Sequence, residues 1–200
     1  MAEGKFSEAG FDATYNKKES IKYGLILGVI SLVLGVIILK IIPHIDDLIS
    51  SIIFSKVVND VFYALIALYF ALKLRKANGG FWNFTIALKS IFVMLLVGVV
   101  ISYLGNEIYC QLIEPGIQVD NMHHSMNLMI ESLESANKEP EIIDSKIVEY
   151  EKAILQLENK TFYTVLRGIT ISILLQFIFS LILAALTRNE KLPPRIVNNN

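Results

Sequence analysis

The sequence predicts an all-α, polytopic membrane protein with four transmembrane helices and an extramembrane helical hairpin between spans three and four. Of its 200 residues, 54% are hydrophobic and only 18% are charged. Average soluble domains are roughly 45–50% apolar and about a quarter charged. Four apolar segments are long enough to cross a bilayer core of about 30 Å. A polar interval with helical periodicity separates the last two.

The composition also excludes several classes of protein. The formal net charge of −1, without a basic stripe interleaved with aromatic residues, gives no reason to expect nucleic-acid binding. A single cysteine, Cys110, permits no internal disulfide and cannot form a thiolate metal site alone. Acidic residues precede the first apolar segment, whereas a signal peptide begins with a basic region poor in acids. We therefore expect the first apolar segment to remain as a membrane span.

The first span is expected over residues 23–42. A stripe of small residues follows one face of this helix at spacings of four, three and four: Gly24, Gly28, Ser31 and Gly35. Small residues let helix backbones approach closely in lipid, where packing drives association. The stripe predicts close packing against another helix of the same chain rather than a dimer interface.

The second span, over residues 52–74, lies in an apolar segment that starts at Leu48 and is longer than a bilayer needs. It carries Lys56 and Asp60 in its outer part, four residues apart. Charged residues inside a membrane usually face the protein and are a functional hypothesis by default. Near the interface, a Lys–Asp pair at this spacing also solvates itself, which is the structural interpretation.

The third and fourth spans are expected over residues 86–109 and 163–186. Both have small residues at helical spacing, which predicts close packing of helices. Arg167 lies near the outer end of the fourth span, at a depth comparable to that of Asp60. After the third span, Glu114-Pro115-Gly116 is expected to end the helix.

The interval between these two spans predicts a helical hairpin over residues 116–160. The first helix has apolar residues at spacings of four, three and four, with Asp120 as its expected N-cap. The second has a similar period, with Pro140 in its first turn. From residue 106 to residue 160 there are eleven acidic residues against four lysines, which argues against adhesion to an anionic membrane surface.

The loop between spans two and three fixes the expected orientation. It contains Lys73, Arg75, Lys76 and Lys89 and no acidic residue, which is typical of a cytoplasmic loop. The membrane domain, residues 21–192, would then place both termini in the cytoplasm and the hairpin in the periplasm. Its flanking segments, residues 1–20 and 193–200, are expected to be cytoplasmic tails.

The sequence contains no signature of catalysis, of a cofactor site or of a metal site. His123 and His124 are adjacent, so on a helix they point about 100° apart and do not chelate one ion together. Glu107, Cys110 and Glu114 combine one soft ligand with two hard ones, a set that suits no common metal. We therefore expect no enzyme, no cofactor and no metal.

A candidate polar cluster lies toward the outer half of the spans. Its members come from three different spans: Lys56, Asn59, Asp60, Glu107 and Arg167. Their functional interpretation is a solute or proton site, and the structural one is an ion-pair network that fixes the helix register. Matched depth alone suggests an ion pair between Asp60 and Arg167.

Several short motifs resemble an uncharacterised bacterial membrane family, the domain of unknown function 4199 (DUF4199). They are Tyr23-Gly24 with Gly28, the turn Gly79-Gly80-Phe81-Trp82-Asn83-Phe84 followed by Ala87-Leu88, and Ile113-Glu114-Pro115. The resemblance extends from roughly residue 19 to residue 191 and includes the helical insert before the last span. It implies four transmembrane helices in the bacterial inner membrane, and it brings no catalytic residues with it.

The function expected from these observations is that of a structural or interaction component. Beyond the lipid bilayer, the expected partner is another protein or a second copy of the chain, bound through residues 120–157. The alternative is a small transporter or channel subunit that uses the outer charges Lys56, Asp60 and Arg167. Against it stand the lack of broken helices and of a charge near mid-membrane.

Overall fold

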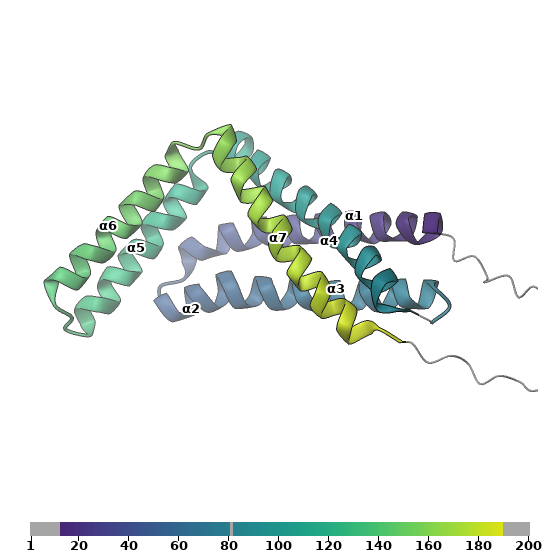
Figure 1. The fold of residues 1–200 in the computed structure, drawn as a ribbon. Coiled ribbons are helices and arrows are strands. Elements are labelled where there is room, and N and C mark those ends of the chain that lie inside the picture. Colours follow the sequence, from purple (N-terminus) through teal and green to yellow (C-terminus); the bar gives the residue numbers. More distant parts are fainter. Residues whose placement is uncertain (1–12, 81, 190–200) are drawn as a thin grey trace, which may run out of the picture.

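The computed structural model describes residues 13–80 and 82–189, and the elements in this part of the chain are helices joined by short turns (Figure 1). The twelve N-terminal residues, the segment 190–200 and Phe81 lie outside the described residues. Most of both expected tails, and one position of the turn that carries the family resemblance, therefore remain predictions from sequence alone.

Four helical rods are long and apolar enough to cross a membrane, which confirms the predicted fold class. Their elements are α1 (Ala13–Ile41) with η1 (Ile42–His44); α2 (Leu48–Ile52), η2 (Ile53–Val58) and α3 (Asn59–Ala77); α4 (Phe84–Ile108) with η3 (Tyr109–Ile113); and α7 (Phe162–Thr187). The first helix begins at Ala13, inside the segment predicted as a tail. No break in helical geometry separates the polar residues before the span from the apolar ones.

The polar interval forms the predicted hairpin of α5 (Ile117–Ser135) and α6 (Pro140–Glu158). Pro140 occupies the first turn of α6 as expected. The expected N-cap of α5 is wrong, because the helix begins earlier and Asp120 lies in its first turn. Gly116 takes the cap position with φ 94°, a left-handed conformation that glycine adopts readily.

The glycine stripe of α1 allows its backbone to contact the backbone of α4 closely. A Cβ on Gly24 would lie 2.6 Å from the carbonyl oxygen of Met94. A Cβ on Gly28 would lie 2.9 Å from that of Gly98. A side chain at either position would push the two helices apart, so the predicted packing within one chain is confirmed. Leu27, between the two glycines, is fully buried.

The bundle is tightest at the end that carries the basic loop, which we call the inner end. The buried cluster there joins four helices; its members include Leu27, Phe70, Leu74, Trp82, Ile91 and Leu183. Tyr23 of α1 stacks on Phe70 of α3 with 5.1 Å between the ring centroids. Toward the opposite, outer end, α4 and α7 lean away from α1 and α3, and the hairpin descends from their apex (Figure 1).

Three hydrogen bonds hold the basic loop to the residues that follow α7. Trp82 and Asn189 exchange two backbone hydrogen bonds of 3.0 and 2.9 Å, each N–H donating to the other's carbonyl. The Asn189 side chain also donates to the carbonyl of Gly80 at 3.0 Å. Trp82 is 1% exposed, so the loop is packed into the inner end rather than hanging below it.

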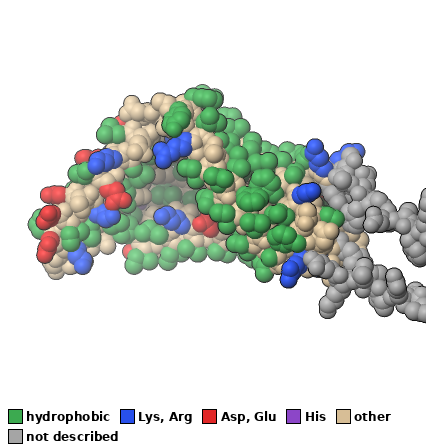
Figure 2. Space-filling view, in the orientation of Figure 1, with side chains coloured by type: hydrophobic (Ala, Val, Ile, Leu, Met, Phe, Trp, Pro, Cys, Tyr) green, Lys and Arg blue, Asp and Glu red, His purple; other side chains and the backbone are tan. Residues whose placement is uncertain are grey.

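Charge separates the two ends of the molecule. Figure 2 shows a broad apolar band between a group of Lys and Arg side chains at one end and the charged hairpin at the other. Many large apolar side chains along this band are exposed; Leu65, Leu174 and Leu175 are about 60% exposed. An apolar surface of this size is what a bilayer covers.

Two π-helical turns interrupt the outer ends of the spans, and the sequence did not predict them. They are η2, before α3, and η3, after α4. A π turn holds an extra residue, so it rotates the residues on its two sides relative to an α-helical register. Lys56 lies inside η2, and no ion pair joins it to Asp60 within the described part of the chain.

Candidate functional site

The strongest polar contact between the spans and the hairpin joins Glu107, Gln118 and Lys160, which we call the outer latch. The Lys160 ammonium lies 2.8 and 3.1 Å from the two carboxylate oxygens of Glu107 and donates to the Gln118 carbonyl at 2.7 Å. Both charged side chains are largely buried, with exposed fractions of 14% for Glu107 and 21% for Lys160. Because water reaches them poorly, their attraction is screened less than that of a surface pair.

The latch is placed by the ends of three helices. Glu107 lies in the last turn of α4, Gln118 in the first turn of α5, and Lys160 in the three-residue link between α6 and α7. One contact therefore fixes both points where the hairpin leaves the spans. Gln111 adds a further hydrogen bond to Glu107 at 3.2 Å.

Two hydrogen bonds tie the hairpin to the last turn of α1 and to the turn that follows the first span. The Asn121 side chain of α5 donates to the carbonyl of Leu39 at 2.9 Å. One turn further on, the His124 ring nitrogen Nε2 is 2.9 Å from the carbonyl oxygen of Ile45, so it donates there. The hairpin is therefore held at its side as well as at its base.

A second ion pair closes the corner after the third span. Lys40, at the outer end of α1, lies 2.9 Å from Glu114, which also accepts a hydrogen bond from the Tyr109 hydroxyl. The hydrogen bond from Tyr109, together with the bond and charge of Lys40, lowers the pKa of the Glu114 carboxyl below its usual range. Glu114 therefore stays ionised at neutral pH and holds α1 against the α4–α5 corner.

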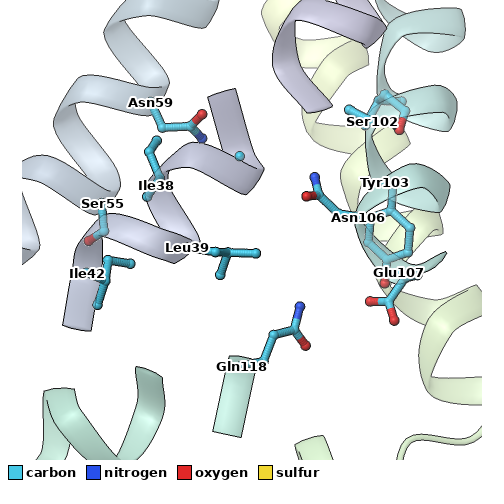
Figure 3. A pocket seen from close by; sticks show the side chains of 12 residues that line it. Ile38, Leu39, Ile42, Ser55, Asn59, Ser102, Tyr103, Asn106, Glu107 and Gln118 are labelled. Carbon is cyan, nitrogen blue, oxygen red and sulfur yellow. Dashed lines mark hydrogen bonds between the residues drawn. The ribbon is translucent and has the colours of Figure 1, made fainter. Parts of the chain in front are cut away.

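A cavity of about 430 Å³ lies next to the latch, between the outer ends of α1, α3 and α4, with α5 below it (Figure 3). We call it the outer cavity. The side facing α1 is mostly aliphatic, with Ile38, Leu39 and Ile42. The remaining wall carries Val99 but is otherwise polar, and its polar residues come from η2, α3, α4 and α5: Ser55, Asn59, Ser102, Tyr103, Asn106, Glu107 and Gln118.

Three carboxamides face this space, from three different elements. Figure 3 shows Asn106 and Gln118 reaching into it, with Asn59 on the opposite side. The Oδ1 atom of Asn106 is buried and has no hydrogen-bond partner among the described residues. Buried polar atoms are normally paired, so this acceptor calls for an explanation.

The predicted polar cluster is divided by the structure. Asn59 and Glu107 both line the outer cavity. Lys56, Asp60 and Arg167 are exposed and do not line it. No ion pair joins Asp60 to Arg167 in the part of the chain that the structure describes, so the pair suggested by matched depth is not formed.

The two carboxylates weighed as metal ligands have other partners. Glu107 is paired with Lys160, and Glu114 with Lys40. Cys110 is a buried free thiol. Within residues 13–80 and 82–189, no three His, Cys, Asp or Glu side chains lie close enough together to hold a metal ion.

Sequence reasoning missed the residues that complete the site: Lys160, Gln118 and Asn106. One signal was present, because Glu107 ends the third span and Lys160 begins the fourth, so both lie at the outer surface. Consecutive antiparallel helices place such flanking charges side by side. Asn106 and Gln118 carried no such signal.

Comparison with known proteins gives one match. The family model described as "Protein of unknown function (DUF4199)" matches residues 22–189, which includes all four spans and the hairpin. No curated protein and no solved structure matches the chain.

Proposed function

The chain belongs to the DUF4199 family of proteins of unknown function, and on that premise we propose that it is an inner-membrane interaction component whose periplasmic hairpin, α5–α6, binds another protein. The four spans anchor the hairpin in the lipid bilayer and hold it at the outer surface. The chain has no catalytic role in this proposal, in which Glu107, Gln118 and Lys160 serve as contacts between helices.

The observation that carries the proposal is that the hairpin is anchored to the spans on one side and exposes charged side chains on the other. The latch, Asn121 and His124 hold it to the spans. Its second helix presents Glu141, Asp144 and Glu151 as exposed side chains. A surface held in a fixed position loses little conformational freedom when it binds, which favours recognition of a partner.

Crosslinking from the exposed side of the hairpin tests this function. A photoreactive residue in place of Glu151 is expected to capture one discrete protein in intact cells, because Glu151 faces outward. The same residue in place of Leu175, which is 59% exposed on the apolar band, is the control and should capture lipid or diverse neighbours. Deleting residues 120–156 should remove the partner while the spans still insert. If crosslinking from position 151 captured only other copies of this chain, the result would count against binding of another protein.

The proposed orientation has its own test, based on thiol labelling. In a Cys110→Ser background, a cysteine at Lys152 of the hairpin is expected to react with a membrane-impermeant maleimide added outside spheroplasts, because Lys152 is exposed. A cysteine at Lys76, in the basic loop, should react only after the membrane is opened, since basic loops stay in the cytoplasm. The opposite labelling pattern would reverse the topology.

The transporter alternative has less support from the side-chain geometry. It needs the outer charges to converge on a path for a solute, yet Lys56, Asp60 and Arg167 do not line the outer cavity. The spans also have no broken helix of the kind that forms transporter sites at mid-membrane. We therefore assign the function to the hairpin surface.

A further inference from the structure

We propose that the outer cavity is a binding site for an uncharged amphiphile whose polar end donates a hydrogen bond, such as a neutral lipid with a free hydroxyl group. This inference does not depend on the function proposed for the hairpin. It rests on the size, charge balance and unsatisfied acceptor of the cavity, and on the position of the cavity between the outer ends of the spans.

The cavity has the volume and two-sided lining of a ligand site. At about 430 Å³ it lies within the range of roughly 300–1,000 Å³ that small-molecule pockets occupy. Its aliphatic side on α1 and its carboxamide and hydroxyl groups on the other walls match a molecule with one apolar and one polar part. Water alone would leave the aliphatic side poorly solvated.

The charge balance of the walls selects an uncharged ligand. Glu107 is the one ionisable acid or base among the lining residues, apart from the phenol of Tyr103. Its carboxylate is already neutralised by Lys160 at 2.8 Å. The nearby ion pair of Lys40 and Glu114 is also closed, and neither residue lines the cavity. A charged ligand would find no free counter-charge in this space, and its desolvation would go uncompensated.

The Asn106 side chain selects a hydrogen-bond donor. Its Oδ1 atom is buried without a partner among the described residues, and the side chain reaches into the cavity (Figure 3). If the amide turned so that this enclosed oxygen faced the cavity, a hydroxyl or N–H of the ligand would satisfy it, whereas an ester or ketone oxygen would not. The Gln118 carboxamide, and that of Asn59 on the opposite side, also line the cavity and offer donors to oxygen atoms of the ligand.

The π-helical turn η2 supports the assignment because it borders this cavity through Ser55. Single π turns are rare and occur frequently at functional sites, since they re-aim side chains within a helix. Asn59, which follows η2, lines the cavity, whereas Lys56 within η2 does not.

Photolabelling of the full chain in phosphatidylcholine nanodiscs tests the inference. The probe is a monoacylglycerol with a diazirine in its acyl chain, and the expected labelled segments are 35–42 and 99–107. Unlabelled monooleoylglycerol should compete, whereas methyl oleate, which lacks a hydroxyl donor, and oleate, which is charged, should compete at least about tenfold more weakly. Equal competition by all three would overturn the proposal, as would labelling spread over the apolar band.

Two variants locate the site. Asn106→Leu should weaken monooleoylglycerol competition about tenfold, because it removes the acceptor while keeping the branched shape of the side chain. The matched change Asn127→Leu, at an exposed position on the hairpin away from the cavity, should leave it unchanged. If Asn106→Leu fails to fold, Ser55→Leu fills the cavity from η2 and must abolish the competition. Unchanged binding in a folded cavity variant would contradict the site, and neither result depends on a protein partner.

Discussion

Lys160→Met will lower the free energy of unfolding by about 2 kcal/mol and release the hairpin from the spans. Removing one member of a buried ion pair costs more than a surface pair contributes, because the other charge stays buried without a partner. Glu107 is 14% exposed, and it also accepts a hydrogen bond from Gln111. The loss of unfolding free energy should therefore lie between the values typical of surface ion pairs and of fully buried ones. Denaturant titration in detergent micelles measures the loss, and hydrogen exchange along α5 and α6 reports the release.

The hairpin contains a matched control for this change. Lys146 forms an ion pair with Glu149 at 2.6 Å, but the two side chains are 43% and 68% exposed. Lys146→Met should therefore cost far less than Lys160→Met, because exposed ion pairs contribute little to stability. The double variant Glu107→Gln/Lys160→Met should recover most of the loss, because no unpaired charge remains. Equal effects at Lys160 and Lys146 would show that the latch is an ordinary surface pair.

The spans and the hairpin follow from local sequence patterns. Long apolar runs and the spacing of apolar residues are properties of neighbouring residues along one helix, so sequence alone predicted them. The glycine stripe also predicted a close partner helix, since a glycine at every turn leaves a groove that only another backbone fills. It did not identify α4 as that partner, because the third and fourth spans carry similar small residues.

The candidate site was predicted less well because it depends on rotation about the helix axes. Depth in the membrane follows from counting along a span, and it grouped Asn59 with Glu107, which both line the outer cavity. Whether Asp60 faces Arg167 depends also on the tilt of α7 and on the rotation that the π turn η2 introduces before α3. When a helix is apolar on every side, the extra residue of a π turn does not change its hydropathy pattern, so the sequence did not predict the turn.

Gly28→Ala will destabilise the fold by about 2 kcal/mol, although alanine favours an α-helix over glycine by about 1 kcal/mol. The new Cβ would lie 2.8 Å from the Cβ of Ile101 and 2.9 Å from the carbonyl oxygen of Gly98. Neither atom moves without displacing α4, which packs on both α1 and α7. The cost of separating the helices should therefore exceed the gain in helix propensity. Thermal unfolding in detergent measures the difference.

Gly35→Ala separates this packing effect from helix propensity. Gly35 continues the same stripe, but a Cβ there would meet only the side-chain amide of Asn106, at 3.1 Å. That amide is at the end of a flexible side chain and faces the outer cavity, so it has room to move. We expect Gly35→Ala to be neutral or slightly stabilising. If Gly28→Ala were equally well tolerated, α1 and α4 would not be in backbone contact, and the spans would be packed less closely than the glycine stripe requires.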